Sequence, residues 1–425
     1  MAAVIAADPD IKQAEQADCS QNAIRGKVDR HHSTVLNLTR VQQLSTGGQR
    51  TQFIGALESV RGLAAISVAI FHCLSPVRIN GELIYNKSIW MIDSAVTLLV
   101  RIASAIFNGT AAVSIFFVIS GFVLALALRR NKGSIIPKSL GFVGRRLFRI
   151  YPALFVNILI MAAVLTALSL IPNFFPSWNR LPSSLHDVVN NLLLTRPAVN
   201  GATWTLIVEI EAIPFILLAY FIVTIFGLRG LGTLTAIAVS LALLTSDGPP
   251  NNLCEFLFMF YLGMFGAWIG SARPTRDYEA RLTPIGCLLA TICLLSARMI
   301  IGYSSKWAVL VEGLSGAYLV TSLAFGRRWW IHTILESGFL RFLGKISYSL
   351  YLYHPLALPV IGFGLVYRLL PNYDLLTIPT LVVLTLCGTI PMAWASFTVI
   401  EAPAIKLGNQ MTKTLLRWHR ASVAA

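Results

Sequence analysis

The chain of 425 residues is 56% hydrophobic and only 12% charged, and its mean hydropathy is +0.69. About a quarter of the residues of soluble domains are charged, so this composition excludes an ordinary soluble protein and predicts a polytopic membrane protein. The net charge of +15 would indicate nucleic acid if the basic residues gathered on one soluble surface, but they lie between apolar segments and we expect no nucleic-acid partner.

The chain divides into a long apolar domain and two polar ends. Residues 1–52 contain no continuous apolar core before a small-residue cleavage site, so we expect no cleaved signal peptide and predict a disordered cytoplasmic tail. Residues 53–404 are predicted to form the integral membrane domain, and residues 405–425 a basic cytoplasmic tail.

Apolar segments of about 20 residues, enough to cross ~30 Å of hydrocarbon, recur through the integral domain. They predict an all-α transmembrane bundle of about ten spans. The predicted spans are 54–76, 109–128, 150–172, 204–226, 231–246, 253–270, 283–302, 308–325, 346–368 and 376–400. The stretch 94–107 is short for a span and contains Arg101, so we interpret it as an interfacial helix or as a bent prelude to the second span.

Lysine and arginine are distributed unequally between the two sides of the predicted bundle. Of the 34 such residues, six lie in loops on the outer side, three lie within spans, and the rest lie on the side of residue 1. Loops that carry most of the basic residues face the cytoplasm, so both termini are predicted to be cytoplasmic.

The first predicted span carries three ionisable side chains, Glu58, Arg61 and His72. At ~100° per residue, Arg61 and His72 lie within ~20° of one direction and ~16 Å apart along the axis, with Glu58 ~40° from His72. In one interpretation Glu58 and Arg61 pair or extend to the boundary and His72 caps the outer end. Because ionisable residues inside a membrane usually face a wet cavity, the aligned set favours an active-site stripe in which His72 transfers a proton.

The segment 129–152 is the most basic of the predicted cytoplasmic segments between spans, which topology alone can explain. It ends in Arg145, Arg146 and Arg149, followed by Tyr151. Residues three or four apart share a helical face, so these arginines form a compact guanidinium surface. Guanidinium groups suit phosphates, and a cytosolic polyanion such as coenzyme A could bind there.

The fourth span begins at Trp204 and contains Glu209 and Glu211. Residues two apart on a helix point ~200° apart, so only one carboxylate can face a shared cavity without bending of the helix, and we favour Glu209. Glu255 and Glu312 are further candidates for lining the same interior.

The ninth span adds hydroxyl groups and a second histidine. Ser347 and Tyr348 stand at its start, and His354 precedes Pro355. Much of this segment suits an interfacial aromatic belt and hydrogen bonds between helices, and for His354 we favour a structural over a catalytic role. The six cysteines show no CxxC spacing, so neither a disulfide framework nor a metal site is expected. The sequence contains no Walker loop and no dinucleotide fingerprint, and we expect no permanently bound cofactor.

Taken together, these stretches resemble the acyltransferase type 3 family of integral membrane proteins over about residues 53–404. Arg61 and His72 match its arginine and histidine with ten residues between them, and SIFFVISGFVL, which includes Ser120, matches its phenylalanine-rich Ser-Gly segment. Arg146 and Arg149 match its paired arginines before Tyr-Pro. WTLIVE, LGKISYSLYLYH and EAP follow in the family's order. Glu58, Ser59 and Thr205 depart from the family's usual Asp, Gly and Ser.

The resemblance implies that an acyl group, commonly acetyl from the donor substrate acetyl-CoA, is transferred to a hydroxyl of a surface or secreted glycan. It also implies that His72 is central to transfer and that Arg146 and Arg149 hold the nucleotide end of the donor. The expected partners are acyl-CoA, a carbohydrate acceptor, the lipid bilayer and polysaccharide synthesis machinery. The expected location is the cytoplasmic (inner) membrane of a bacterium.

The resulting hypothesis gives every candidate residue a role. His72 acts as general base or as a transiently acylated nucleophile, supported by three ionisable side chains, while basic and aromatic residues hold the donor and others line the site. The supporting residues are Arg61, Glu209 and Glu58; the donor residues are Arg145, Arg146, Arg149 and Tyr151; the lining residues are Ser120, Trp204, Ser347, Tyr348 and His354.

Two other functions fit buried charges in a membrane bundle. A secondary transporter of a glycan or an anionic metabolite should show two matching halves with paired interrupted helices, and the sequence shows none. A sensor or assembly subunit would use Arg61 and His72 only to pair across the bundle, and would turn over no donor.

Overall fold

The computed structural model describes residues 55–75, 78–79, 82–83, 90, 94–130, 135–172, 174, 184–245, 252–272, 283–366 and 377–424. These residues are almost entirely helical. The exception is a small antiparallel pair of two-residue strands, β1 (Arg78–Ile79) and β2 (Glu82–Leu83), in which Arg78 lies opposite Leu83. The prediction of an all-α polytopic bundle is confirmed. The predicted tail 1–52 lies outside the described residues.

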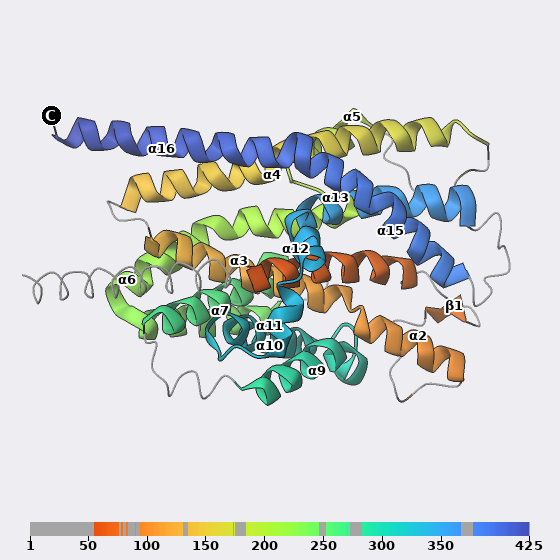
Figure 1. Cartoon of the computed structure of the whole chain (residues 1–425), viewed down its shortest axis with the longest axis horizontal. Coiled ribbons are helices and arrows are strands. Elements are labelled where there is room, and N and C mark those ends of the chain that lie inside the picture. Colours follow the sequence, from red (N-terminus) through yellow and green to blue (C-terminus); the bar gives the residue numbers. More distant parts are fainter. Residues whose placement is uncertain are drawn as a thin grey trace, which may run out of the picture. The chain divides into compact units, whose positions relative to one another are not determined.

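The helices follow one another along the chain as Figure 1 shows. The first half contains the helix Gly55–Leu74, α2 (Ala95–Ile106), α3 (Gly109–Arg130), α4 (Ile135–Ser169), α5 (Leu185–Leu192), the short η3 (Gly201–Thr203) and α6 (Trp204–Leu244). The second half contains α7 (Asn252–Ala272), α9 (Pro284–Ile301), α10 (Lys306–Phe325), α11 (Trp330–Leu335), α12 (Gly338–Lys345), α13 (Ser347–Ile361), η4 (Gly362–Val366), α15 (Thr377–Ser396), η5 (Phe397–Glu401) and α16 (Ala402–Ala424).

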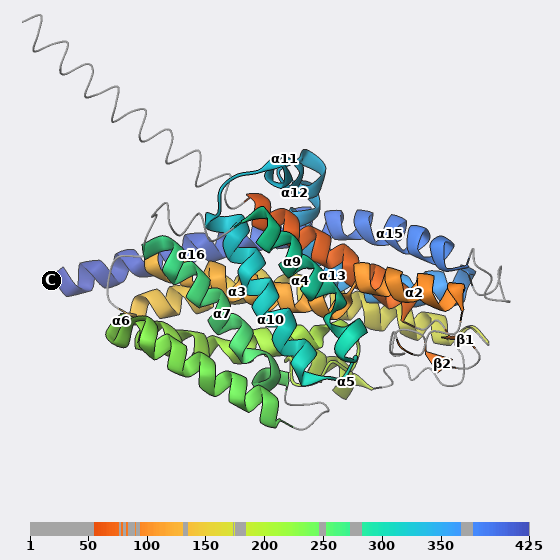
Figure 2. The ribbon, with the colours of Figure 1, turned by 90° about the horizontal axis from the view of Figure 1, so that it is seen from below.

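Within the described part of the chain, nine helical segments are long and apolar enough to cross a membrane. The predicted spans 204–226 and 231–246 both lie in α6, whose 41 residues would extend about 60 Å if straight, twice the hydrocarbon thickness. Gly227 has φ 65° and ψ −157° and interrupts the helix. Figure 2 shows the two halves of α6 diverging. The two segments are therefore joined through a glycine bend, without a loop.

The stretch 94–107 forms α2, a helix of its own. Ser94 caps its first turn by accepting a hydrogen bond from the Thr97 amide at 3.2 Å, as serine commonly does at this position. The helix ends at Ile106, and α3 starts at Gly109. Most of α2 and α3 belong to one apolar segment, Thr97–Arg129, that is long enough to cross a membrane, which agrees with the interpretation of 94–107 as a bent prelude to the second span.

Many large apolar side chains on the spanning helices are exposed. Examples are Phe155 on α4, Phe226 on α6 and Leu288 on α9. Exposed apolar surface of this extent is unfavourable in water and favourable in hydrocarbon, so these faces suit contact with lipid. Several polar residues of the same helices, among them Ser114, Asn157 and Glu312, are buried inside the bundle.

Helices α3 and α7 cross closely because each presents a glycine to the other's backbone. A Cβ added at Gly121 would meet the carbonyl oxygen of Phe260, and one added at Gly263 would meet the backbone of Val118 and Phe122. Small residues at crossing points allow this approach in membrane bundles. Side chains at these two positions would separate α7 from α3, the helix that carries Ser120.

Replacing Gly263 with alanine should therefore lower the thermal stability of the detergent-solubilised protein. Overpacking against a backbone that cannot yield typically costs about 1–3 kcal/mol. Gly144→Ala on α4 is the matched control, because an added Cβ there meets nothing within 4 Å. Equal melting temperatures for the two variants would contradict the close crossing.

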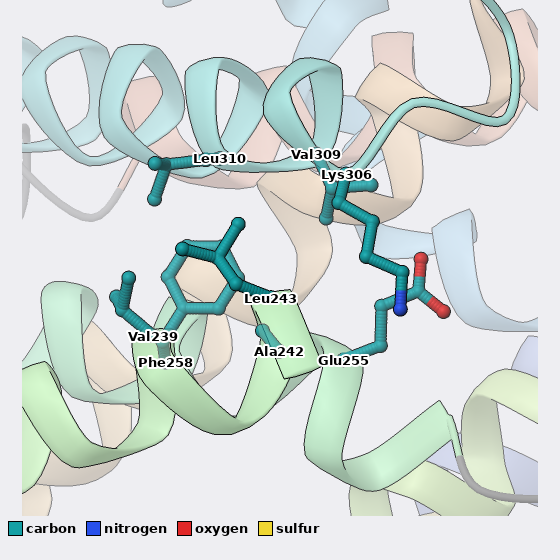
Figure 3. A pocket seen from close by; sticks show the side chains of 8 residues that line it. All are labelled: Val239, Ala242, Leu243, Glu255, Phe258, Lys306, Val309 and Leu310. Carbon is teal, nitrogen blue, oxygen red and sulfur yellow. The ribbon is translucent and has the colours of Figure 1, made fainter. Parts of the chain in front are cut away.

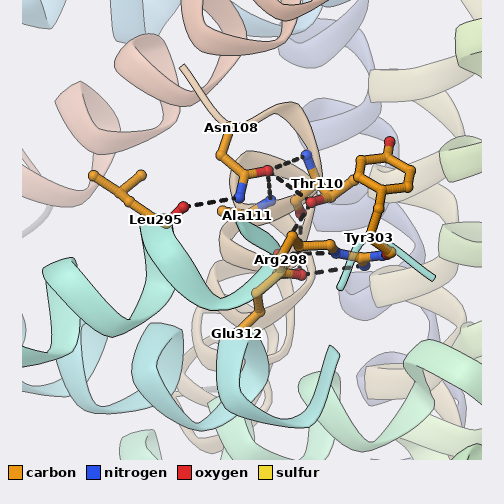
Figure 4. Close-up of polar contacts among 8 residues, drawn as sticks. Asn108, Thr110, Ala111, Leu295, Arg298, Tyr303 and Glu312 are labelled. Carbon is orange, nitrogen blue, oxygen red and sulfur yellow. Dashed lines mark hydrogen bonds and ion pairs between the residues drawn. The ribbon is translucent and has the colours of Figure 1, made fainter. Parts of the chain in front are cut away.

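A buried polar network joins α3, α9 and α10 (Figure 4). Glu312 is 0% exposed and accepts hydrogen bonds from Arg298 Nε at 3.1 Å and from Ser114 Oγ at 3.1 Å. Asn108 caps α3 by accepting from the Ala111 amide, and its side-chain nitrogen donates to the Leu295 carbonyl at 3.2 Å. The Arg298 guanidinium thus neutralises the Glu312 carboxylate, which would otherwise be a buried charge without a partner.

Glu312→Ala should destabilise the bundle by about 3–5 kcal/mol, because it leaves the Arg298 guanidinium without its carboxylate. Thermal unfolding in detergent measures the effect. Replacing both residues by leucine removes the unpaired charge, and we expect that double variant to recover most of the lost stability. A double variant as unstable as Glu312→Ala would show that the ion pair is not the cause.

Candidate active site

A polar cleft opens between the first helix and helices α3, α4, α6 and α13. Its volume is about 820 Å³, including the space at its mouth. The polar side chains that line it are Arg61, Ser120, Arg146, Arg149, Thr205, Glu209, Ser347, Tyr348 and Tyr351. Apolar residues complete the wall, among them Phe116, Phe117, Ile119 and Leu206. Segments from most of the chain therefore contribute to one site.

An ion pair between Arg146 and Glu209 stands at the centre of the cleft. The Arg146 side chain is 7% exposed and that of Glu209 is 26% exposed. Ser120 completes the group: its hydroxyl donates to Glu209 Oε1 at 2.9 Å and accepts from an Arg146 nitrogen at 3.1 Å. Three helices thus fix the orientation of the carboxylate and the guanidinium.

The cleft carries an excess of positive charge. Three arginines, Arg61, Arg146 and Arg149, line it together with one carboxylate, that of Glu209. Only Arg146 is paired directly with that carboxylate. A pocket with apolar walls strengthens the field of such charges and attracts anions. The arrangement can hold a phosphate or another anionic group between guanidinium forks.

The two-residue spacing of the acids on α6 has the expected consequence. Glu209 faces the cleft, whereas Glu211 is exposed.

The three ionisable residues predicted to form one stripe on the first helix do not all face the cleft. Arg61 lines the cleft, but neither Glu58 nor His72 does. Glu58 is half-buried, and its backbone lies against Gly344 at the end of α12.

Three other predicted residues lie beside the cleft without lining it. Arg145 precedes Arg146 on α4 and points about 100° away from it. Tyr151 packs against the apolar core that includes Ile150 and Leu154. Trp204 packs against Phe117, with ring centroids 6.3 Å apart, and so supports the aromatic wall from behind. Their predicted roles in binding the donor and lining the site are not supported by direct contact with the cleft.

The histidines meet each other away from the arginines. His354 Nε2 lies 3.2 Å from His72 Nδ1, and the two ring centroids are 5.0 Å apart. Helix α13 connects this pair with the cleft. Ser347 and Tyr351 line the cleft, and His354 shares their helical face. The rings of Tyr351 and His354 are 5.6 Å apart. The arginines and the histidine pair therefore occupy two ends of one polar surface.

Sequence reasoning missed several contacts around this surface. Tyr351 donates to the Ala202 carbonyl at 2.9 Å and accepts from Thr205 at 3.0 Å. Glu401 is buried and accepts from the Ser349 hydroxyl at 2.9 Å. Ser347, Tyr351 and His354 are spaced four and then three residues apart, which places them on one helical face. This spacing could have indicated that Tyr351 faces the site. The position of Glu401 depends on the packing of η5 on α13 and has no such local signal.

The two remaining acidic candidates lie elsewhere. Glu312 belongs to the network of Figure 4. Glu255 lines a smaller pocket of about 210 Å³ between α6, α7 and α10, where Figure 3 shows the Lys306 amino group pointing toward its carboxylate. Among the described residues, no group of three or more His, Cys, Asp and Glu side chains could hold a metal ion.

The fold and the site define a class, a multi-pass membrane protein with a buried, positively charged cleft beside a histidine pair. Residues 54–397 match the sequence model of the acyltransferase domain of type 3, within the predicted domain 53–404. The chain belongs to the acyltransferase type 3 family, as the order of its motifs predicts. No curated protein and no solved structure matches it. Family membership supports acyltransferase activity in a membrane.

Proposed function

We propose that the protein is a membrane O-acyltransferase that moves an acetyl group from cytosolic acetyl-CoA to a hydroxyl of a surface or exported glycan. The observation that carries the proposal is the cleft of three arginines and one carboxylate in an apolar wall. A neutral glycan would need no such charge, whereas the phosphates of a coenzyme A thioester suit it.

The donor enters the cleft with its phosphates at Arg146 and Arg149, and Arg61 adds charge from the first helix. Glu209 holds Arg146 in place while the cleft is empty, because the two side chains form an ion pair with Ser120 beside them. Arg149 is not committed to that carboxylate by a direct contact, which leaves its guanidinium for the donor. The thioester arm then extends along α13 toward the histidines.

His72 acts as the general base. It removes the proton from the acceptor hydroxyl as the oxygen attacks the thioester carbonyl, the carbon–sulfur bond breaks, and the departing thiolate receives the proton back. The products are an ester on the glycan and free coenzyme A. Arg61 and His72 are ~16 Å apart along their helix at 1.5 Å per residue, so an extended donor is needed to bring its acyl group from the arginines to the base.

The distribution of basic residues indicates that the arginine end of the cleft faces the cytoplasm and that His72 lies near the outer face. An acceptor that meets His72 there is a growing or lipid-linked polysaccharide or lipo-oligosaccharide. This setting is the cytoplasmic membrane of a bacterium, beside the enzymes that build the glycan.

Release of coenzyme A tests the proposal. Purified protein in detergent is mixed with acetyl-CoA and a bacterial glycan extract, and the free thiol is followed with a colorimetric reagent. We expect release that requires the protein and the glycan together. Release at the same rate without glycan would indicate a thioesterase, and no release with folded protein would favour transport or assembly.

A further inference from the structure

We propose that His354 is a positioning residue for His72, holding its imidazole in the tautomer and orientation that a general base requires. The inference rests on the proposed function, in which His72 removes the proton of the acceptor hydroxyl. It assigns to His354 a part in the reaction, where the sequence alone favours a structural role.

The proton on the His72 ring is located by its neighbours. His72 Nδ1 lies 2.9 Å from the carbonyl oxygen of Val68, one turn earlier on the same helix. A carbonyl oxygen only accepts hydrogen bonds, so the Nδ1 that contacts it carries the hydrogen. A neutral imidazole has one N–H, which leaves His72 Nε2 with a free electron pair.

His354 faces the same Nδ1–H from the opposite helix. Its Nε2 lies 3.2 Å from His72 Nδ1, and because the hydrogen is on His72, the His354 nitrogen accepts. The hydrogen is thus shared between the Val68 carbonyl and the His354 ring, which together fix the ring's rotation as well as its tautomer. Histidines that act as bases are commonly oriented by an acceptor on the second nitrogen.

The burial of the two rings differs in a way that suits these roles. His354 is 1% exposed, and it comes from α13, 282 positions along the chain from His72. His72 is only half-buried, and among the described residues its Nε2 makes no hydrogen bond. The enclosed His354 ring contacts His72 from the interior, and the half-buried His72 ring leaves its Nε2 for the hydroxyl of the acyl acceptor.

In many enzymes a carboxylate accepts the hydrogen bond from the second nitrogen of the catalytic histidine, whereas here the acceptor is the neutral imidazole of His354. It orients the base without adding a negative charge to a buried site, so it contributes less to stabilising the protonated His72. We therefore expect the loss of the His354 acceptor to cost about one hydrogen bond, which lowers the transfer rate about tenfold. The loss of His72 itself should lower the rate far more.

Three replacements of His354 separate positioning from packing. His354→Phe keeps much of the volume and removes the acceptor, whereas His354→Gln and His354→Asn keep an oxygen that can accept from His72 Nδ1. We expect kcat to fall about tenfold in His354→Phe with KM for acetyl-CoA unchanged, and to recover in at least one amide variant. Melting temperatures in detergent confirm that the compared variants are folded.

A spectroscopic measurement on the unmodified protein covers the case in which His354→Phe does not fold. Nitrogen-15 spectra of histidine-labelled protein, with His72→Ala to assign the signals, report which ring nitrogen carries the hydrogen. A protonated Nδ1 and free Nε2 on His72 are expected. A protonated Nε2 would overturn the proposal, as would a folded His354→Phe variant with unchanged kcat. Absence of acyl transfer in the unmodified protein would instead refute the proposed function.

Discussion

His72→Ala should lower the rate of acyl transfer 10²–10⁴-fold, the usual contribution of a positioned base, while the protein still binds acetyl-CoA. The reason is the separation of the two parts of the site. His72 does not line the arginine cleft, so its removal leaves the arginines in place and takes away only the proposed proton acceptor. Transfer kinetics and donor binding are measured on the same purified preparation.

The matched control is His186→Ala. His186 is exposed on α5, where its only described contact is with Asn190 one turn away, and we expect its replacement to leave transfer unchanged. Full activity of a folded His72→Ala variant would remove His72 from the reaction. Loss of donor binding in that variant would show that the two parts of the site are not separate.

Arg149→Ala should raise KM for acetyl-CoA by about 10- to 100-fold, the value of a charge-assisted hydrogen bond of 1.5–3 kcal/mol. Arg149 lines the cleft without forming the ion pair that occupies Arg146. Its replacement should therefore weaken the donor site, while Glu209 keeps its ion pair with Arg146. We expect kcat at saturating donor to change little, because the base is untouched.

Arg145→Ala is the control on the same helix, because Arg145 is outside the cleft. Initial rates over a range of acetyl-CoA concentrations should give a KM close to that of the unmodified protein. Higher salt should weaken donor binding less in Arg149→Ala than in the unmodified protein. Equal effects of the two replacements would mean that the donor is attracted by the general charge of this segment and not by the cleft.

Much of this site follows from helical geometry within single segments. The two-residue spacing of Glu209 and Glu211 requires that they face different directions, and the structure places the first in the cleft and leaves the second exposed. The spacing of Arg146 and Arg149 likewise puts both on one face, and both line the cleft. Periodicity decides such questions because one helix contains all the residues involved.

Contacts between segments that are far apart in the sequence cannot be predicted from helical periodicity. Arg61 and His72 share a direction on the first helix, but α13 packs along it so that Tyr351 lines the cleft and His354 reaches His72. The single stripe therefore contributes to both ends of the polar surface. Glu58 lies on the same side by helical arithmetic, yet the close approach of Gly344 places it against α12. Which helix packs on which face depends on tertiary packing, and one sequence does not reveal it.

The most direct test of the account is the transfer of radiolabel from acetyl-CoA to glycan in inverted membrane vesicles, whose exposed face is the cytoplasmic one. The account predicts label in glycan with the unmodified protein, a strongly reduced rate with His72→Ala, and recovery of transfer by higher donor concentration with Arg149→Ala. Equal labelling of glycan with His72→Ala, or no labelling by folded protein in the presence of a broad glycan extract, would contradict it.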